Sequence, residues 1–403
     1  MKRRLALFFL GEFLGTLPFS LGLFVLYLAS RGLTLAEVGL VQTLLFWSNL
    51  IFEIPAGILA DRFKRKYSLA LGYLIGALAT LLTTQAEGLF QFAWVWVLYG
   101  MGFAFRSGAN TALLYDEIKM AGPAWAGRYL RISGWHRALT NTGIVVALAL
   151  GGQLQVLGWN FVFGAEALCS ILAALLLVTL DETPHHKANA EESNRPSVIS
   201  AISQFLSSSR GRALSIFLIS VGLIEALTTP VFVYSQAFFK NQGLSEAAVS
   251  TTIAVIAGIS TVTALGAQHL ARIPFRKLVL GSALLLTATA LLFFLNPGAL
   301  AGALLVGMID LIPVSLFLHT DNYINARIPT AIRASLLSFK AATRSICISG
   351  VYLVGGRMLD QYPSAKVLGS MALLPLMGAV ALAYYFRNLE KRVPVVAEAQ
   401  TAH

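Results

Sequence analysis

The chain has 403 residues, of which 57% are hydrophobic and 12% are charged, and its formal net charge is +11. Soluble domains carry about 25% charged residues, so this composition excludes a soluble globular protein and favours a membrane protein. The basic residues stand in short clusters between apolar runs, as membrane proteins place them, which argues against a nucleic-acid-binding protein despite the positive charge.

Apolar runs recur from one end of the chain to the other, and each is long enough to cross a bilayer core of about 30 Å. The first run follows Met1-Lys2-Arg3-Arg4. It is too long for a signal peptide and lacks a small-residue cleavage site, so we interpret it as a membrane helix. The sequence therefore predicts an all-helical polytopic membrane protein with twelve spans. They lie near residues 5–30, 36–60, 67–85, 90–114, 133–156, 160–180, 213–239, 246–269, 277–295, 299–320, 334–356 and 366–387.

A polar segment between the sixth and seventh spans divides the predicted helices into two halves of six. The predicted parts are an amino-terminal six-helix bundle over residues 1–180, a linker over 181–212, a carboxy-terminal six-helix bundle over 213–390 and a tail over 391–403.

A weak internal repeat relates the two halves. Gly57 and Gly72 bracket a charged turn in the first half, and Gly266 and Gly281 bracket its counterpart in the second half at the same spacing. Parallel halves that bind a substrate between them near the membrane midplane are one transporter architecture.

Counting lysine and arginine residues predicts how the spans are oriented. Basic residues concentrate on one side of the membrane, whereas the other side receives only Arg31, Lys240, Arg357 and Lys366. We therefore expect both termini and the linker to be cytoplasmic, in a multi-pass protein of the inner (plasma) membrane.

The charged turn of the first half carries the most specific motif. Residues 57–66 read Gly-Ile-Leu-Ala-Asp-Arg-Phe-Lys-Arg-Lys. This turn resembles the loop between the second and third helices of the major facilitator superfamily of transporters, whose pattern is Gly-x-Leu-Ala-Asp-Arg-x-Gly-Arg-Lys. The match fails only at Lys64, where the family usually has Gly.

The resemblance implies a conformational gate at this turn. Gly57 would allow close helix packing, and Asp61 would lie near the start of the eleventh helix and tie the halves together in the outward-open state. Arg62, Arg65 and Lys66 would anchor the turn to anionic headgroups and nearby carboxylates. Asp116, after the fourth span, would join this gate by pairing with Arg128 or Arg131, or with Arg62 and its neighbours.

The fifth span has glycines at spacings similar to the family's antiporter motif. They are Gly134, Gly143, Gly151 and Gly152. Ala147 and Leu148 replace the third Gly and the Pro of that motif. In the family this motif is linked to exporters that exchange substrate for protons, so the resemblance favours export by exchange. Generic packing of small residues is the alternative.

Ionisable residues within spans are costly and point to function. The resemblance places the first, fourth, seventh and tenth helices around a cavity, which would bring Glu12, Arg106, Glu225 and Asp310 together. A carboxyl group in a low-dielectric cavity can bind and release a proton near neutral pH, which proton coupling requires.

The predicted function is alternating-access transport of a small organic molecule such as a drug, siderophore or other metabolite, by proton-coupled export. The alternatives are a proton-coupled importer and a lipid flippase of the same fold. A membrane enzyme is not expected, because the histidines are scattered and no Ser/His or metal constellation stands out. We therefore expect no catalytic residue, no metal and no cofactor, a proton gradient as the energy source because no ATP-binding loop is present, and a monomer in the lipid bilayer.

Overall fold

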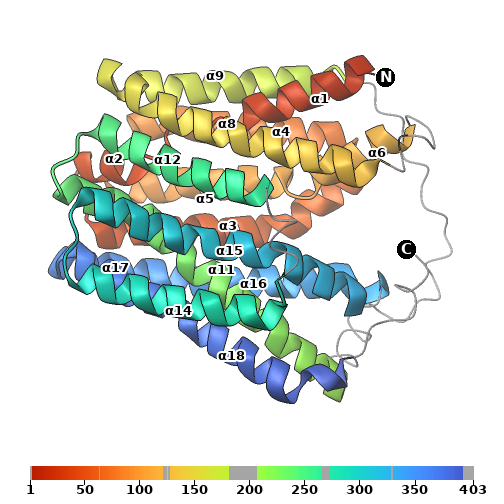
Figure 1. Cartoon of the computed structure of the whole chain (residues 1–403). Coiled ribbons are helices and arrows are strands. Elements are labelled where there is room, and N and C mark those ends of the chain that lie inside the picture. Colours follow the sequence, from red (N-terminus) through yellow and green to blue (C-terminus); the bar gives the residue numbers. More distant parts are fainter. Residues whose placement is uncertain are drawn as a thin grey trace. The chain divides into compact units, whose positions relative to one another are not determined.

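The computed structural model describes residues 2–62, 64–120, 125, 128–180, 207–265, 273–327 and 330–393. All regular structure in these ranges is helical, as predicted (Figure 1). The helices of the first part of the chain are α1 (Lys2–Gly15), α2 (Phe24–Ser30), α3 (Leu35–Arg62), α4 (Arg65–Gln85), α5 (Gly88–Arg106), α6 (Ala109–Met120), α8 (Tyr129–Leu157) and α9 (Trp159–Val178). The later helices are α11 (Ser209–Asn241), α12 (Glu246–Leu265), α14 (Phe275–Phe294), α15 (Ala299–Arg327), α16 (Thr330–Gln361), α17 (Ser364–Leu373), α18 (Pro375–Asn388) and the short 3₁₀ helix η2 (Glu390–Arg392).

Ten helices in the described part of the chain are long and apolar enough to cross a membrane. Ten of the predicted spans thus have a counterpart, and the count of twelve stays a prediction. The predicted first span is absent from the ten because it is not one continuous helix. The predicted eleventh span corresponds to α16, whose apolar stretch is interrupted by Lys340 and Arg344.

The prediction of a single first helix over residues 5–30 is wrong, because the chain breaks between Gly15 and Phe24. Pro18 explains the break, since proline disfavours the helical conformation of the residue before it and has no N–H to donate. A break inside a membrane exposes backbone polar groups that must find partners. The carboxylate of Glu166 on α9 accepts a hydrogen bond from the backbone N–H of Ser20 at 2.8 Å, and both residues are buried.

Contacts between Cα atoms divide the chain into two compact units. Unit 1 contains α1 to α9, the end of α11 from Gln236, α12 as far as Thr261, and the end of α16 from Tyr352. Unit 2 contains α11 as far as Ser235, α14, α15, α16 as far as Val351, α17 and α18. The sequence-based division at residues 180 and 212 follows the polar segment between the sixth and seventh spans and not these contacts, and it stays a prediction.

Glycines allow close helix contacts in unit 1, where α4 packs against both α5 and α9, and α1 packs against α9. A Cβ atom at Gly72 on α4 would lie 2.8 Å from the carbonyl oxygen of Gly102 on α5. A Cβ atom at Gly100 would lie 2.4 Å from the carbonyl oxygen of Leu45 on α3. These backbones approach so closely because the glycines have no side chain.

In unit 2, α14 packs against α15, α17 and α18. A Cβ atom at Gly378 on α18 would lie 2.6 Å from the carbonyl oxygen of Ser220 on α11. The absence of a side chain at Gly378 thus allows these two helix backbones to approach closely. Both units are therefore held by close packing of helix backbones, which fixes the side chains described next.

Candidate functional site

A buried carboxylate, Glu12 on α1, lies at the centre of a polar cluster in unit 1. Only 1% of Glu12 is exposed. Its Oε1 accepts a hydrogen bond from the hydroxyl of Tyr73 at 2.9 Å, and its Oε2 lies 3.2 Å from Nε2 of His136. The side-chain amide of Asn110 donates to Oε2 at 3.5 Å. Residues from α1, α4, α6 and α8 thus surround one carboxylate, which satisfies the hydrogen-bonding needs of a buried charge.

Aromatic rings and a glycine position this cluster. Tyr73 reaches Glu12 across Gly15, where a Cβ atom would lie 2.1 Å from the ring of Tyr73. The ring of His136 packs against Phe8 at 5.4 Å and is stacked on Phe9 at 5.8 Å between centroids. Glu12 and His136 are both buried beside these rings, and charges interact more strongly in such a low-dielectric environment.

Arg106, at the end of α5, lies beside the same cluster. Its guanidinium is 5.0 Å from the ring centroid of Tyr73 and 4.4 Å from that of Phe103, within the range of cation–π contacts. Its Nη1 donates a long hydrogen bond of 3.5 Å to the carbonyl oxygen of Gly15. Two of the predicted cavity residues, Glu12 and Arg106, are therefore connected through Tyr73.

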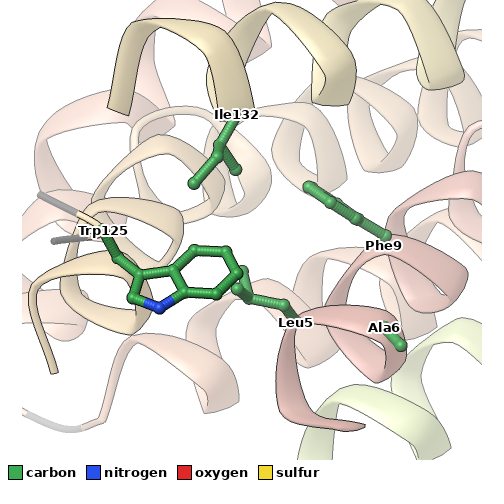
Figure 2. A pocket seen from close by; sticks show the side chains of 5 residues that line it. All are labelled: Leu5, Ala6, Phe9, Trp125 and Ile132. Atoms are coloured by element: carbon green, nitrogen blue, oxygen red, sulfur yellow. The ribbon is translucent and has the colours of Figure 1, made fainter. Parts of the chain in front are cut away.

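An apolar pocket of 330 Å³ lies next to the cluster, lined by Leu5, Ala6, Phe9, Trp125 and Ile132 (Figure 2). Phe9 belongs to both features, since one side of its ring contacts His136 and it also lines the pocket.

Unit 2 holds a second carboxylate–cation pair, on α11 and α16. Nζ of Lys340 donates to Oε1 of Glu225 at 2.7 Å, and both side chains are mostly buried, with 15% and 22% exposed. Asp310, the fourth predicted cavity residue, lies half-buried on α15 of the same unit. The predicted gathering of all four residues in one cavity stays a prediction.

The two pairs occupy related positions in the sequence. Glu12 begins the segment Glu-Phe-Leu-Gly-Thr-Leu-Pro, and Glu225 begins the segment Glu-Ala-Leu-Thr-Thr-Pro. In both segments a threonine hydroxyl donates back to the glutamate carbonyl: Thr16 at 2.7 Å and Thr229 at 3.0 Å. The basic partner lies on α8 in the first case and on α16 in the second, the helices of the predicted fifth and eleventh spans. This short repeat relates Glu12 to Glu225 in the sequence, and the ion-pair geometry then makes His136 and Lys340 their corresponding partners.

The predicted gate residues lie at the end of unit 1 where α3 ends and α4 begins, here called the basic side. Nη1 of Arg65 forms an ion pair of 2.5 Å with the carboxylate of Asp116 on α6. Among the partners considered for Asp116, the structure therefore selects a neighbour of Arg62. Gly57 does not show the expected close packing, because a Cβ atom there would meet no described atom within 4 Å. Asp61 and Arg62 end α3, and their side chains lie outside the described residues.

Lys66 has a different role from the expected contact with lipid headgroups. Only 7% of it is exposed, and its ammonium donates to the carbonyl oxygens of Val178, at 2.8 Å, and Leu180. These carbonyls lie at the end of α9, where a helix presents unsatisfied acceptors and partial negative charge. Lys66 therefore caps α9 from α4.

The opposite side of unit 1 contains contacts that the sequence did not predict. The amide of Gln236 on α11 accepts from the N–H of Val25 at 3.2 Å and donates to the carbonyl oxygen of Leu21 at 2.9 Å. Gln236 is completely buried. Leu21 lies in the break of the first helix and Val25 lies at the start of α2, so Gln236 joins the end of α11 to both segments by hydrogen bonds.

A second such contact joins α16 to the start of α3. The carboxylate of Asp360 accepts hydrogen bonds of 2.9 Å from the backbone N–H groups of both Leu35 and Ala36. These are the first residues of α3, where N–H groups lack helical partners and the helix dipole favours an anion. Thr34 and Glu37 form a capping box at the same end.

The glycines of the antiporter-like helix α8 pack on two neighbours. A Cβ atom at Gly143 would lie 3.2 Å from the ring of Phe13. A Cβ atom at Gly151 would lie 2.1 Å from the carbonyl oxygen of Phe19. A Cβ atom at Gly152 would lie 2.8 Å from the carbonyl oxygen of Ala247 on α12. At Gly134 it would meet no described atom within 4 Å. Three of the four glycines thus lie in tight contacts, two of them with the broken first helix.

Comparison with known proteins assigns the chain to a family. Residues 6–349 match the Major Facilitator Superfamily. A probable 4-methylmuconolactone transporter of Cupriavidus pinatubonensis is 24% identical over 364 residues, which cover 87% of this chain and 81% of that protein.

Solved structures share the fold. A mutant of the nucleoside transporter NupG superposes with a TM-score of 0.76 at 18% identity, covering 96% of this chain and 99% of that one. A bacterial homolog of the human lysosomal transporter Spinster, in an inward-facing and occupied conformation, gives a TM-score of 0.76 at 15% identity, covering 97% of each chain. The chain is therefore a multi-pass membrane transporter, not an enzyme, and it belongs to the Major Facilitator Superfamily.

Proposed function

We propose that this protein exports a small organic molecule in exchange for protons, with Glu12 as the residue that carries the proton. The observation that supports this most is the buried cluster in which Glu12 contacts Tyr73, Asn110 and His136. An ionised carboxylate accepts all of these contacts, whereas a protonated one must donate one hydrogen bond. A proton on Glu12 therefore rearranges contacts among α1, α4, α6 and α8.

His136 and Arg106 are the basic residues that face this carboxylate, the first directly and the second through Tyr73. An imidazole can both accept and donate a proton, so the pair has a second group able to take part in proton transfer. The antiporter-like spacing on α8, whose glycines pack against the first helix that carries Glu12, favours exchange over symport. We further propose the inner membrane and cytoplasmic termini, which agree with the distribution of basic residues. We also propose that the protein acts as a monomer.

The test uses protein reconstituted right side out in liposomes, with a labelled nucleoside and 4-methylmuconolactone as the first probes because relatives are named for them. Acidifying the outside should accelerate efflux of the preloaded probe. Uptake driven by the same gradient would instead show proton-coupled import and overturn the proposed direction.

The variant Glu12→Gln tests the proton carrier. It should abolish efflux driven by the pH gradient but retain exchange of labelled for unlabelled probe, because exchange needs no net proton movement. The matched control is Glu37→Gln, which alters an exposed carboxylate of the α3 capping box. Gradient-driven efflux at the normal rate in Glu12→Gln would exclude Glu12 as the proton carrier.

A further inference from the structure

Arg344, on α16 in unit 2, is an arginine without a compensating anion in the described part of the chain. Its Nε is buried and has no hydrogen-bond acceptor among the described residues. No carboxylate in the described ranges lies within ion-pair distance of its guanidinium. An arginine remains charged at every physiological pH, and a charge at membrane depth needs a partner.

The surroundings of Arg344 already contain one balanced ion pair. Lys340 lies four residues earlier, so both cations are on one face of α16. Glu225 on α11 pairs with Lys340 at 2.7 Å. A Cβ atom at Gly222 would lie 3.8 Å from Cγ of Lys340 and 4.0 Å from the backbone nitrogen of Arg344, so α11 packs beside the turn of α16 that carries both cations. These three charged groups therefore have a net charge of +1.

The corresponding site in unit 1 differs in one chemical respect. Glu12 faces His136, which can be neutral, and the nearby Arg106 rests on two aromatic rings. The described residues around Arg344 provide no such ring contact. The two repeat-related sites therefore differ in charge. The site in unit 1 pairs a carboxylate with a histidine, whereas the site in unit 2 contains an arginine that is always charged.

From these contacts we infer that Arg344 binds the carboxylate of the transported molecule, so that the substrate is a small organic anion. A guanidinium binds a carboxylate through two parallel hydrogen bonds, which gives both affinity and orientation. Glu225 neutralises Lys340, so the net positive charge of this group of side chains is that of Arg344. The inference rests on the proposed transport function and names the chemical class of its substrate.

The experiment measures thermal unfolding of the purified full-length protein at constant pH and ionic strength. The probes are benzoate, phenylacetate, 4-hydroxybenzoate and succinate, each compared with its carboxamide. At least one carboxylate should raise the melting temperature, and its carboxamide should not. Arg344→Gln should weaken the apparent affinity by roughly tenfold or more, whereas Arg344→Lys should retain part of it.

Two further variants separate recognition from a structural role. Glu225→Gln releases Lys340 and adds one net positive charge, so the affinity for the carboxylate should rise. Arg357→Gln, which removes an exposed arginine from the same helix, is the matched control and should not change it. A purely structural role for Arg344 would not predict opposite effects in the Glu225 and Arg344 variants.

Three results would overturn the inference. The first is stabilisation by carboxamides as well as by carboxylates, and the second is no stabilisation by any carboxylate. The third is an apparent affinity for the carboxylate in Arg344→Gln that equals that of the unaltered protein. Stabilisation by phosphatidylglycerol that requires Arg344 and exceeds that of every carboxylate would assign the site to a lipid headgroup instead. Because no pH gradient is applied, a failure of this test is distinguishable from a loss of proton coupling in Glu12→Gln.

Discussion

The carboxylate of Asp360, the penultimate residue of α16, accepts a hydrogen bond of 2.9 Å from the backbone N–H of Leu35, the first residue of α3. It also binds the N–H of Ala36. A helix start is therefore capped by a side chain from a distant part of the chain. If the proposed transporter works by alternating access, we expect this cap to break whenever α3 and α16 separate at this side.

We predict that Asp360→Ala favours opening at the side that holds this cap. A lost cap costs about 1 kcal/mol, which is about a fivefold shift in a two-state equilibrium. The reporter is Ser250→Cys in a background without Cys169 and Cys347, because Ser250 is completely buried and donates to the carbonyl oxygen of Leu148. The rate of maleimide labelling should rise about fivefold.

Glu37→Gln is the control for this measurement, since Glu37 caps the same helix from within. It should leave the labelling rate unchanged. An equal rise in both variants would mean that the stability of α3, and not its contact with α16, governs access to position 250.

A second prediction concerns the break in the first helix. Glu166→Leu should lower the free energy of unfolding by about 1–3 kcal/mol, because the buried N–H of Ser20 loses its acceptor. Glu166→Gln keeps a side-chain oxygen and should cost less. Melting temperatures in detergent would check both, and a Gln variant as unstable as the Leu variant would show that charge matters more than the hydrogen bond.

A third prediction compares two glycines of the same helix. In Gly151→Ala the new methyl group would lie 2.1 Å from the carbonyl oxygen of Phe19, so we expect a loss of about 1–3 kcal/mol of stability. Gly134→Ala meets open space and should be neutral or slightly stabilising, because alanine has the higher helix propensity. Equal melting temperatures of the two variants would contradict the packing described for α8.

A fourth prediction tests the role of Lys66. Lys66→Met keeps the length of the side chain but removes the donor to the carbonyls of Val178 and Leu180, and should cost about 1–3 kcal/mol. Lys64→Met, in the same turn, is the matched control. If Lys66 acted only on lipid headgroups, both variants would have the same stability in neutral detergent and would differ only in anionic membranes.

Properties that depend on single residues or short windows follow from the amino-acid sequence by itself. Long apolar runs identify membrane helices because hydrocarbon tolerates only apolar side chains and internally bonded backbone, and ten of the predicted spans appear as such helices. The family is also recognisable, since the turn at residues 57–66 retains nearly all of its motif. Glu12 stands out because a carboxylate within an apolar run is costly wherever it points.

The partners of these residues depend on the tertiary structure. Glu12 meets Tyr73 and His136 only because α1, α4 and α8 pack together, and no spacing along the chain encodes that contact. Lys66 resembles a surface cation in the sequence, but packing of α4 against α9 buries it at a helix end. Asp360 gives no local signal at all. A side chain's chemistry is present in the sequence, whereas its hydrogen-bond partner is chosen by the approach of distant helices.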